Sequence, residues 1–199
     1  DVALWDIAGK AAGMPVHRLL GTCRNRVAAY ASSATHESPG QYVDEALKYQ
    51  SEGYSAYKIH PHGIPQRDVE VCRAVRRAVG DEMVLMLDPV AWYNYETALR
   101  VGRVLEELNY YWFEEPLPDS DIYGLSKLCR DLDIPVIATE STPLGFYGMQ
   151  QYIIQGATDM LRGDVALKGG ITSLMKIAHL AEAFRMNCEV HHGGNSLNN

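Results

Sequence analysis

Three short apolar stretches, each closed by an acidic residue, constrain the fold of this 199-residue chain more than any other feature. They end at Asp88, Glu114 and Glu140, and 26 residues separate each acid from the next. Each stretch is rich in aromatic, β-branched or long apolar residues, which is typical of a buried parallel strand. Because a strand and its return helix occupy roughly 30 residues, the three acids are predicted to end successive parallel strands.

The same alternation of strand-like and helix-like stretches runs through the rest of the chain. Strands are expected at 26–32, 56–60, 83–88, 110–114, 135–140, 159–164 and 187–191. Helices are expected at 1–20, with a break at Gly13, and at 38–50, 67–79, 94–108, 123–132, 145–155 and 171–184. Strict alternation requires parallel strands joined by right-handed crossovers. A doubly wound sheet shares this alternation, but acids at three consecutive strand ends favour a barrel.

The expected fold is therefore α/β, an incomplete TIM-like barrel that has seven strands and lacks the last one. Residues 1–21 are expected to form a helical segment that leads into the barrel, and residues 22–199 to supply barrel strands one to seven. An open sheet edge is unfavourable in an isolated fragment. The intact protein is therefore expected to be longer than this chain.

Composition excludes several classes of partner. The net charge is −7 and no basic run occurs, so nucleic acid is not an expected partner. No apolar stretch is long enough to span a membrane, so no membrane association is expected either. The four cysteines are scattered without C-x-x-C spacing, and free thiols of this kind suit a reducing cytoplasm.

Ionisable residues also close the other predicted strands. Lys58 and His60 lie two residues apart, so their side chains point to one face of the second strand. Asp164 ends the sixth strand and His191 or His192 the seventh, with His191 favoured by the phase of the strand. A single strand-end acid is most simply a helix N-cap, whereas a series at this end of a barrel predicts a functional site. Converging carboxylates require neutralisation, and a hard divalent cation provides it through oxygen ligands.

Several motifs occur together in a fixed order, and as a set they are specific. They are Lys58-x-His60, Leu87-Asp88, Phe113-Glu114-Glu115-Pro116, Ala138-Thr139-Glu140, Asp164-Val-Ala-Leu-Lys-Gly-Gly170, Val190-His191-His192 and the opening stretch 1–21. In these motifs the chain resembles the mandelate racemase-like subgroup of the mandelate racemase/muconate lactonizing enzyme family, in the enolase superfamily. The resemblance implies a (β/α)₇β barrel, Mg²⁺ held by Asp88, Glu114 and Glu140, and abstraction of the proton α to a carboxylate.

The resemblance also implies roles for the flanking residues. Asp164 and His191 correspond to an acid–base dyad, and Lys58 is expected to neutralise the substrate carboxylate. His60 stands where the subgroup usually has a second lysine as base, and an imidazole there is still a candidate base. Weaker candidates for contact with the substrate are His62, Trp92 and His192, which lie in or beside loops at this end of the barrel.

Four functions remain open at this stage. The first is dehydration of an acid sugar or related hydroxy acid, and the second is racemisation or epimerisation of a hydroxy or amino acid, which needs bases on both faces of the α carbon. The third is a metal-binding barrel without activity, which the departures at His60, Val90 and Leu167 would favour. The fourth is an unrelated phosphate-binding barrel enzyme, with His192-Gly-Gly-Asn as a weak anion loop. The expected cofactor is Mg²⁺, the expected partner is a small carboxylate substrate, and a homo-oligomer is expected.

Overall fold

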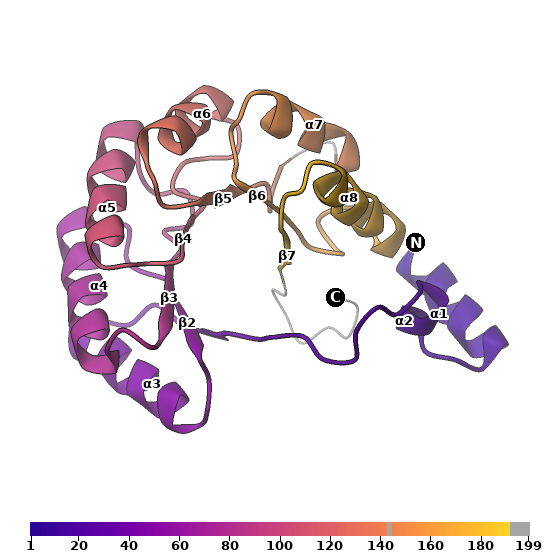
Figure 1. Ribbon diagram of the computed structural model, residues 1–199, viewed down its shortest axis with the longest axis horizontal. Helices are drawn as coiled ribbons and strands as arrows, with labels where there is room; N and C mark the ends of the chain where they lie inside the picture. The colour runs from indigo at the N-terminus through magenta and orange to yellow at the C-terminus, as the bar shows by residue number, and fades with distance from the viewer. Residues whose placement is uncertain (143–144, 192–199) are drawn as a thin grey trace.

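Seven parallel strands form one curved sheet in the computed structural model, within residues 1–142 and 145–191, which are the residues that the structure describes (Figure 1). The strands are β1 Ala31–Ser32, β2 Ala56–Ile59, β3 Val84–Leu87, β4 Trp112–Glu114, β5 Val136–Ala138, β6 Met160–Gly163 and β7 Cys188–Val190. Their order in the sheet is their order in the chain. The predicted parallel alternation is therefore confirmed.

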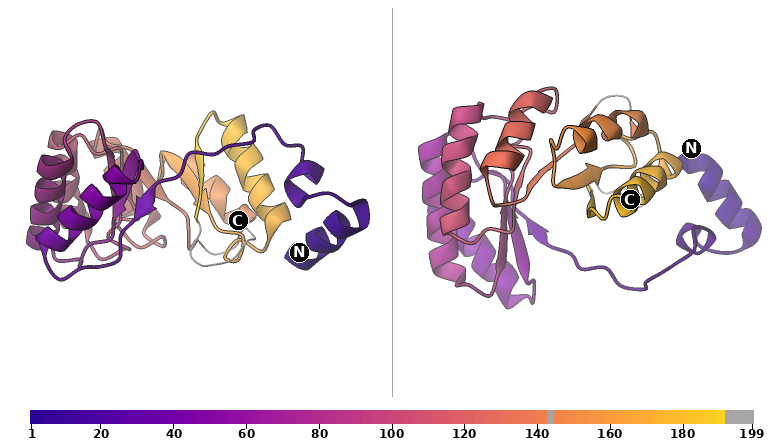
Figure 2. Two further views of the ribbon diagram at one scale, coloured as in Figure 1. Left: turned by 90° about the horizontal axis from the view of Figure 1, so that it is seen from below. Right: turned by 45° about the horizontal axis from the view of Figure 1, so that its top comes forward.

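Helices cover the outer face of this sheet, except for the two nearest the N-terminus, which lie beyond its end (Figures 1 and 2). They are α1 Val2–Ala12, α2 Val16–Leu19, α3 Pro39–Ser51, α4 Pro65–Val79, α5 Tyr95–Glu107, α6 Ile122–Asp131, α7 Phe146–Ile154 and α8 Ile171–Ala183. The first two lie at the far end of the arc beside α8, where the indole of Trp5 donates to Thr172 Oγ1 at 2.9 Å. Gly13 adopts φ 64° and ends α1, which is the predicted break. None of the helices in the described ranges is long and apolar enough to cross a membrane.

Local capping signals start several helices directly after a strand-end loop. Ser38 and Gln41 form a capping box at the start of α3. The side chain of Asn94 accepts the backbone N–H of Thr97 at 2.9 Å, and Asp121 accepts that of Gly124 at 2.9 Å. These caps fix where the helices begin after the strand-end loops, and the parallel pairing of the strands aligns their carboxyl ends along one rim of the sheet.

The sheet is an open arc in the described residues, because β1 and β7 are not paired with each other. Residues 20–30 run as an extended segment from α2 along the open side to β1 (Figure 1). The predicted strand at 26–32 was too long, since only Ala31 and Ser32 pair with β2. The rest of that segment has no neighbouring described strand with which to form a ladder. The incomplete TIM-like barrel expected from the sequence is confirmed.

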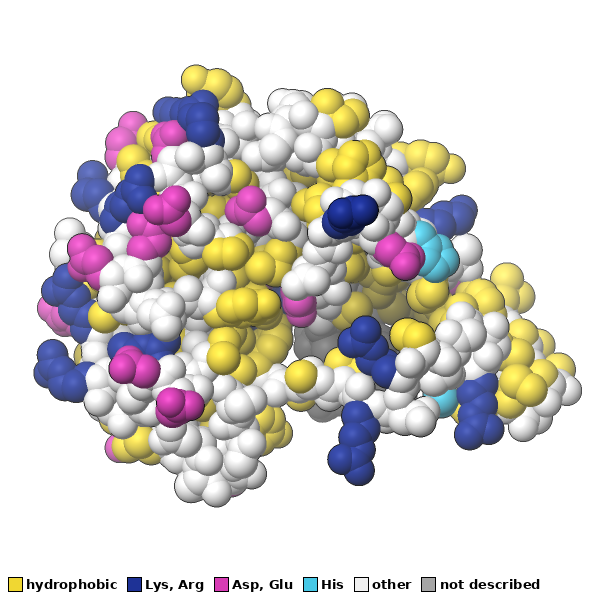
Figure 3. All heavy atoms as spheres, in the orientation of Figure 1, with side chains coloured by type: hydrophobic (Ala, Val, Ile, Leu, Met, Phe, Trp, Pro, Cys, Tyr) yellow, Lys and Arg dark blue, Asp and Glu magenta, His cyan; other side chains and the backbone are white. Residues whose placement is uncertain are grey.

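Apolar side chains lie on both faces of the sheet. Outward-pointing residues such as Tyr57, Leu87 and Phe113 pack against the helices in the main core. A second cluster lies on the inner face and consists of Met86, Trp112, Ile137 and Met160, called the apolar floor below. Figure 3 shows charged side chains spread along the outer rim of the arc and hydrophobic side chains gathered toward its inner side. Because side chains alternate along each strand, the inward positions nearer the carboxyl ends lie directly above this floor.

Candidate active site

Acidic and basic side chains alternate in a row above the apolar floor. Lys58 Nζ lies 3.0 Å from Asp88 Oδ2 and 2.7 Å from Glu114 Oε1. Arg162 Nε lies 2.9 Å from Glu114 Oε1 and 2.9 Å from Glu140 Oε2. The structure thus brings together the three acids proposed from the sequence as metal ligands, linked by two shared cations. We call these five side chains the charged row.

The buried charges of the row require partners of opposite charge. Glu114 is 0% exposed, Arg162 1% and Lys58 2%. An isolated charge at such depth costs several kcal/mol, and only close partners with good geometry offset the cost. Glu114 has a further partner, because the indole of Trp112 donates to its Oε2 at 2.9 Å. Every charge in the row is therefore hydrogen-bonded to at least one opposite charge.

The acids of the row differ in their proton affinity. Burial and the nearby charge of Asp88 raise the pKa of Glu114 to about 7. Burial also acts to raise the pKa of Asp88, but hydrogen bonds from His60 and Lys58 and their positive charges outweigh it and hold that pKa well below its usual range. Burial acts to lower the pKa of Lys58, and the charges of Asp88 and Glu114 reverse this so that it is raised. Lys58 is accordingly an ammonium in this arrangement.

His60 is already engaged on both ring nitrogens. Its Nε2 lies 3.0 Å from Asp88 Oδ2, and its Nδ1 lies 2.9 Å from the carbonyl oxygen of Ser33. Two acceptors require two N–H donors, so the ring is an imidazolium here. Burial acts to lower the pKa of His60, but the hydrogen bond with Asp88 outweighs it and the pKa is raised. A protonated ring held in this way is a poor candidate for the base.

Glu140 reaches the inner face through an unusual backbone conformation. Alternation along β5 would turn Glu140 outward, because Ala138 packs in the main core. Thr139 has φ 89°, which is an outlier for a β-branched residue. Its hydroxyl accepts the N–H of Arg162 at 2.9 Å and donates to the Arg162 carbonyl oxygen at 3.0 Å. The Glu140 N–H in turn donates to Glu115 Oε1 at 3.0 Å, so the kinked segment is held at several points.

His191 and Asp164 form a pair at the other end of the charged row. Asp164 Oδ2 lies 3.0 Å from His191 Nδ1, and its Oδ1 accepts the backbone N–H of Ala166 at 2.6 Å. Asp164 therefore both orients the imidazole and caps the turn that follows β6. With Nδ1–H directed at the carboxylate, Nε2 is the atom left to exchange a proton; its separation of 3.4 Å from Glu140 Oε1 is longer than the 3.0 Å contact that engages Nε2 of His60.

The weaker candidates are placed differently. Trp92 is 69% exposed and its ring lies against Gly63, where a Cβ would come within 2.6 Å of Trp92 Cγ. His62 is partly buried, and its Nδ1 has no hydrogen-bond partner among the described residues. The structure brings neither of them into the charged row. His192 lies outside the described residues.

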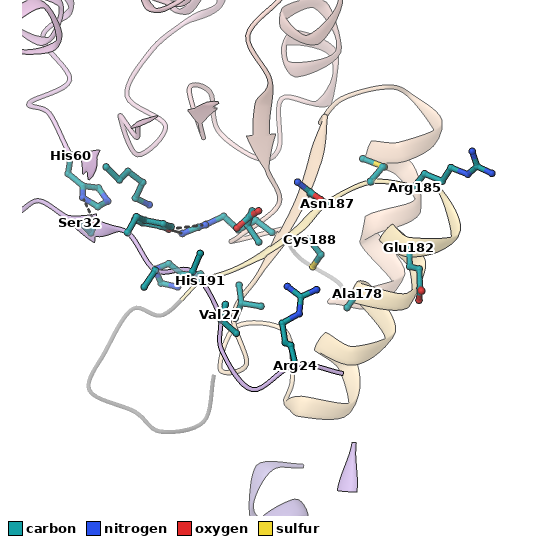
Figure 4. A pocket seen from close by; sticks show the side chains of 18 residues that line it. Arg24, Val27, Ser32, His60, Ala178, Glu182, Arg185, Asn187, Cys188 and His191 are labelled. Carbon is teal, nitrogen blue, oxygen red and sulfur yellow. Dashed lines mark hydrogen bonds between the residues drawn. The ribbon is translucent and has the colours of Figure 1, made fainter. Parts of the chain in front are cut away.

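A cavity of about 1050 Å³ follows the open side of the arc between the two edges of the sheet, and none of the three acids of the charged row lines it. Ser32 and His60 line it from the β1–β2 edge, and Cys188 and His191 from the β7 edge (Figure 4). Lys58 and Arg162 form part of its wall. Its lining also includes Arg185 and Asn187, which precede β7, so the cavity extends well beyond the strand ends that carry the site.

The donor atoms of the three acids are those that the predicted Mg²⁺ prefers. No three His, Cys, Asp or Glu side chains in residues 1–142 and 145–191 converge as a preformed metal-ligand group. Asp88, Glu114 and Glu140 nevertheless supply only carboxylate oxygens, which suit a hard cation, and two of them already share one positive centre at Lys58 Nζ. Each carboxylate retains acceptor capacity that no described donor fills. The residues therefore fit Mg²⁺ in donor type.

Sequence reasoning missed Arg162 and the tyrosine that covers it. The Tyr30 hydroxyl lies 3.4 Å from Arg162 Nη2, and the Tyr30 ring lies 5.7 Å from Lys58 Nζ. One signal was available: Arg162 precedes Asp164 by two residues, as Lys58 precedes His60. The period of two therefore places both cations on the inner face, one inward position deeper than the strand-end groups.

Comparison with known proteins gives consistent matches along the chain. The family model described as "Enolase C-terminal domain-like" matches residues 41–198. The chain is 37% identical to L-talarate/galactarate dehydratase of Salmonella typhimurium over 91% of its own length and 46% of that protein. It is 31% identical to arabinonate dehydratase of Saccharolobus solfataricus, over 99% of the chain and 54% of that protein. A D-Ala-D/L-Ala epimerase of Cytophaga hutchinsonii is 28% identical over 96% of the chain and 51% of the epimerase.

Solved structures agree with these matches. The structure of D-glucarate dehydratase from Agrobacterium tumefaciens, complexed with magnesium, superposes with a TM-score of 0.96 at 38% identity. The superposition covers 100% of this chain and 55% of the dehydratase chain. The chain thus spans about half the length of the relatives it matches. Their agreement with the family model shows that this chain belongs to the enolase superfamily, in its mandelate racemase/muconate lactonizing enzyme family.

Proposed function

We propose that this chain forms the barrel of an Mg²⁺-dependent enzyme that removes the proton α to a carboxylate, and that the overall reaction dehydrates an acid sugar or related hydroxy acid. The observation that carries the proposal is the His191–Asp164 pair at 3.0 Å beside the acids of the charged row. It combines an oriented base with groups that can stabilise a developing negative charge.

The base in this mechanism is His191. Its Nε2 takes the α proton, and the electron pair of the broken C–H bond moves into the carboxylate to give an enediolate. Asp164 accepts from Nδ1–H at 3.0 Å and so stabilises the imidazolium that forms. The imidazolium then returns the proton to the β-hydroxyl as the C–O bond breaks, and water leaves. The resulting enol tautomerises to a 2-keto-3-deoxy acid.

The charged row supplies the countercharge for the enediolate. Lys58, an ammonium with partners at 2.7 and 3.0 Å, can turn from these acids to the substrate carboxylate. A divalent cation held by Asp88, Glu114 and Glu140 would supply Lewis-acid stabilisation of the same charge. Binding of that cation by the acids would release Lys58 for the substrate.

Dehydration is preferred over racemisation because the two faces of the site are unequal. Racemisation needs a base opposite His191, and the groups available there are Lys58 and His60. Both are protonated and paired with Asp88 in this arrangement. The relatives support both classes, since they include two sugar-acid dehydratases and a dipeptide epimerase. The racemase or epimerase function therefore remains the second candidate.

The test is a screen of sugar acids with the purified protein and Mg²⁺, reading formation of 2-keto-3-deoxy acids. His191→Asn should abolish the signal, whereas His179→Asn, an exposed histidine on α8, should leave it unchanged. Recovery of deuterated substrate with inverted configuration from D₂O, without keto acid, would establish the racemase instead. Absence of turnover and of deuterium exchange across the whole library would favour the inactive barrel.

A further inference from the structure

Arg162 has an environment that differs from that of an ordinary surface or loop cation. Its Nε alone contacts two carboxylates, Glu114 and Glu140, each at 2.9 Å. Its backbone N–H and carbonyl oxygen are both bonded to the hydroxyl of Thr139. The guanidinium is thereby fixed from its backbone to its tip, and the side chain is 1% exposed.

Arg162 also links acids that no other lysine or arginine links. Within the described residues it is the only Lys or Arg that lies within 4.0 Å of Glu140, which otherwise contacts His191. The other cation of the row, Lys58, neutralises Asp88 and Glu114 instead. Without Arg162, the buried carboxylate of Glu114 and the partly buried carboxylate of Glu140 would lie near each other with one fewer positive charge.

The two cations of the row differ in what they can do next. Lys58 has a flexible stem with a compact ammonium that can be redirected, whereas a guanidinium keeps its charge under all protein conditions. The side chains of the apolar floor beneath the row offer Arg162 no acceptor, so its side-chain partners are Glu114, Glu140 and the Tyr30 hydroxyl. Arg162 therefore keeps its positive charge beside these acids, and that charge repels any cation that binds to them.

We infer that Arg162 is a built-in counter-ion and positioning residue, which lets Glu114 and Glu140 fold side by side without a metal and lowers the affinity of the site for Mg²⁺. This inference rests on the proposed role of these two acids as metal ligands. It has two linked consequences. Removing the charge should weaken the fold in the absence of added metal, and it should strengthen the attraction for a divalent cation because one nearby repulsive charge is lost.

The experiment compares Arg162→Met, which removes the charge at similar length, with Arg162→Lys, which keeps it. Thermal unfolding is followed by circular dichroism in chelator and in millimolar Mg²⁺, and Mg²⁺ binding is measured by calorimetry. Arg162→Met should bind Mg²⁺ roughly tenfold more tightly, and Mg²⁺ should raise its Tm by more than it raises that of the unmodified protein. Arg162→Lys should remain close to the unmodified protein in both measurements.

Arg76→Met is the matched control. Arg76 is also a buried arginine, but it donates to backbone carbonyls, such as those of Leu108 and Met83, far from the acids. Its loss should lower Tm equally with and without Mg²⁺. The inference is overturned if Arg162→Met behaves in the same way, or if it stays unfolded in Mg²⁺. If the unmodified protein itself does not bind Mg²⁺, the proposed metal function fails first and the inference fails with it.

Discussion

The hydroxyl of Tyr93 offers a quantitative test of how the loops after β2 and β3 are held together beside the site. It donates to Asp68 Oδ2 at 2.6 Å, while Asp68 Oδ1 accepts the backbone N–H of His62 at 3.1 Å. Asp68 is 0% exposed and Tyr93 is 5% exposed. The substitution Tyr93→Phe removes the hydroxyl and keeps the ring, so it isolates this one hydrogen bond.

The magnitude follows from the charge of the acceptor. A hydrogen bond to a charged group contributes about 1.5–3 kcal/mol to stability. In the variant, the buried carboxylate of Asp68 would have one hydrogen-bond donor fewer. For a protein of this size, 1 kcal/mol corresponds to about 2–4 °C in Tm, so Tyr93→Phe should lower Tm by about 3–12 °C.

The loss of stability in Tyr93→Phe should also depend on pH. Burial raises the pKa of Asp68, and the Tyr93 hydrogen bond opposes that rise, so Tyr93→Phe should raise the pKa further. A carboxyl whose folded-state pKa is raised makes the fold more stable at low pH, where it is protonated, than at higher pH. This stability is lost as the pH rises through the folded-state pKa. The deficit of the variant should therefore be largest at neutral pH and shrink in acid, where the carboxyl is protonated.

Urea unfolding at neutral and at mildly acidic pH measures both effects. The control is Tyr95→Phe, because Tyr95 donates to Asp131 in a similar pair that is only partly buried, and its loss should lower the midpoint by less than the loss of the Tyr93 hydroxyl does. Equal losses in the two variants, or a Tyr93→Phe deficit that does not change with pH, would refute the reasoning.

Three further predictions concern the dyad, a loop and a helix contact. Asp164→Asn should lower kcat for keto-acid formation by about 10²–10⁴, because the amide lacks the charge that stabilises the imidazolium of His191 and can donate to Nδ1, which favours the wrong tautomer; an unchanged kcat would remove the dyad from the mechanism. Glu106→Gln should lower the free energy of unfolding in urea by about 1–2 kcal/mol, because Glu106 accepts the backbone N–H groups of Asp133 and Ile134 before β5 and the amide oxygen that replaces its carboxylate is uncharged. Burial acts to raise the pKa of Glu106, but bonds from Arg103 and the backbone lower it overall; this stabilisation should thus be present above its unfolded pKa and fade as pH falls through the folded one. Gly102→Ala should cost about 1–3 kcal/mol in the same assay, because its Cβ would come within 2.5 Å of Leu132 Cδ1, and a neutral result would show that Leu132 yields freely.

Periodicity along the chain was sufficient to predict the architecture. The apolar stretches that end at Asp88 and Glu114 correspond to β3 and β4. Both acids point inward, as simple alternation from the inward residues Met86 and Trp112 predicts. The short β1 could not be predicted in the same way. Strand assignment depends on a hydrogen-bonded neighbour, and a single sequence does not say where that neighbour is.

The details of the site were less accessible, and Glu140 shows why. Its equal spacing from Glu114 suggested an equivalent strand end, yet strict alternation alone would turn it outward. It faces inward because Thr139 takes φ 89°, and that conformation depends on hydrogen bonds to Arg162 on the next strand. A pairing between residues on different strands leaves no local pattern. The role of Arg162 was missed for the same reason.

The apolar floor limits the directions from which protons and ions can reach the charged row. Met86, Trp112, Ile137 and Met160 carry no group that relays a proton along the inner face, and they are nearly inaccessible to water. Hydrocarbon also screens charge poorly, so the field of the row above it is directed outward through the carboxyl-end mouth. The row holds three carboxylates and two cations, so its own field is negative, and it attracts a divalent cation from the side of the loops.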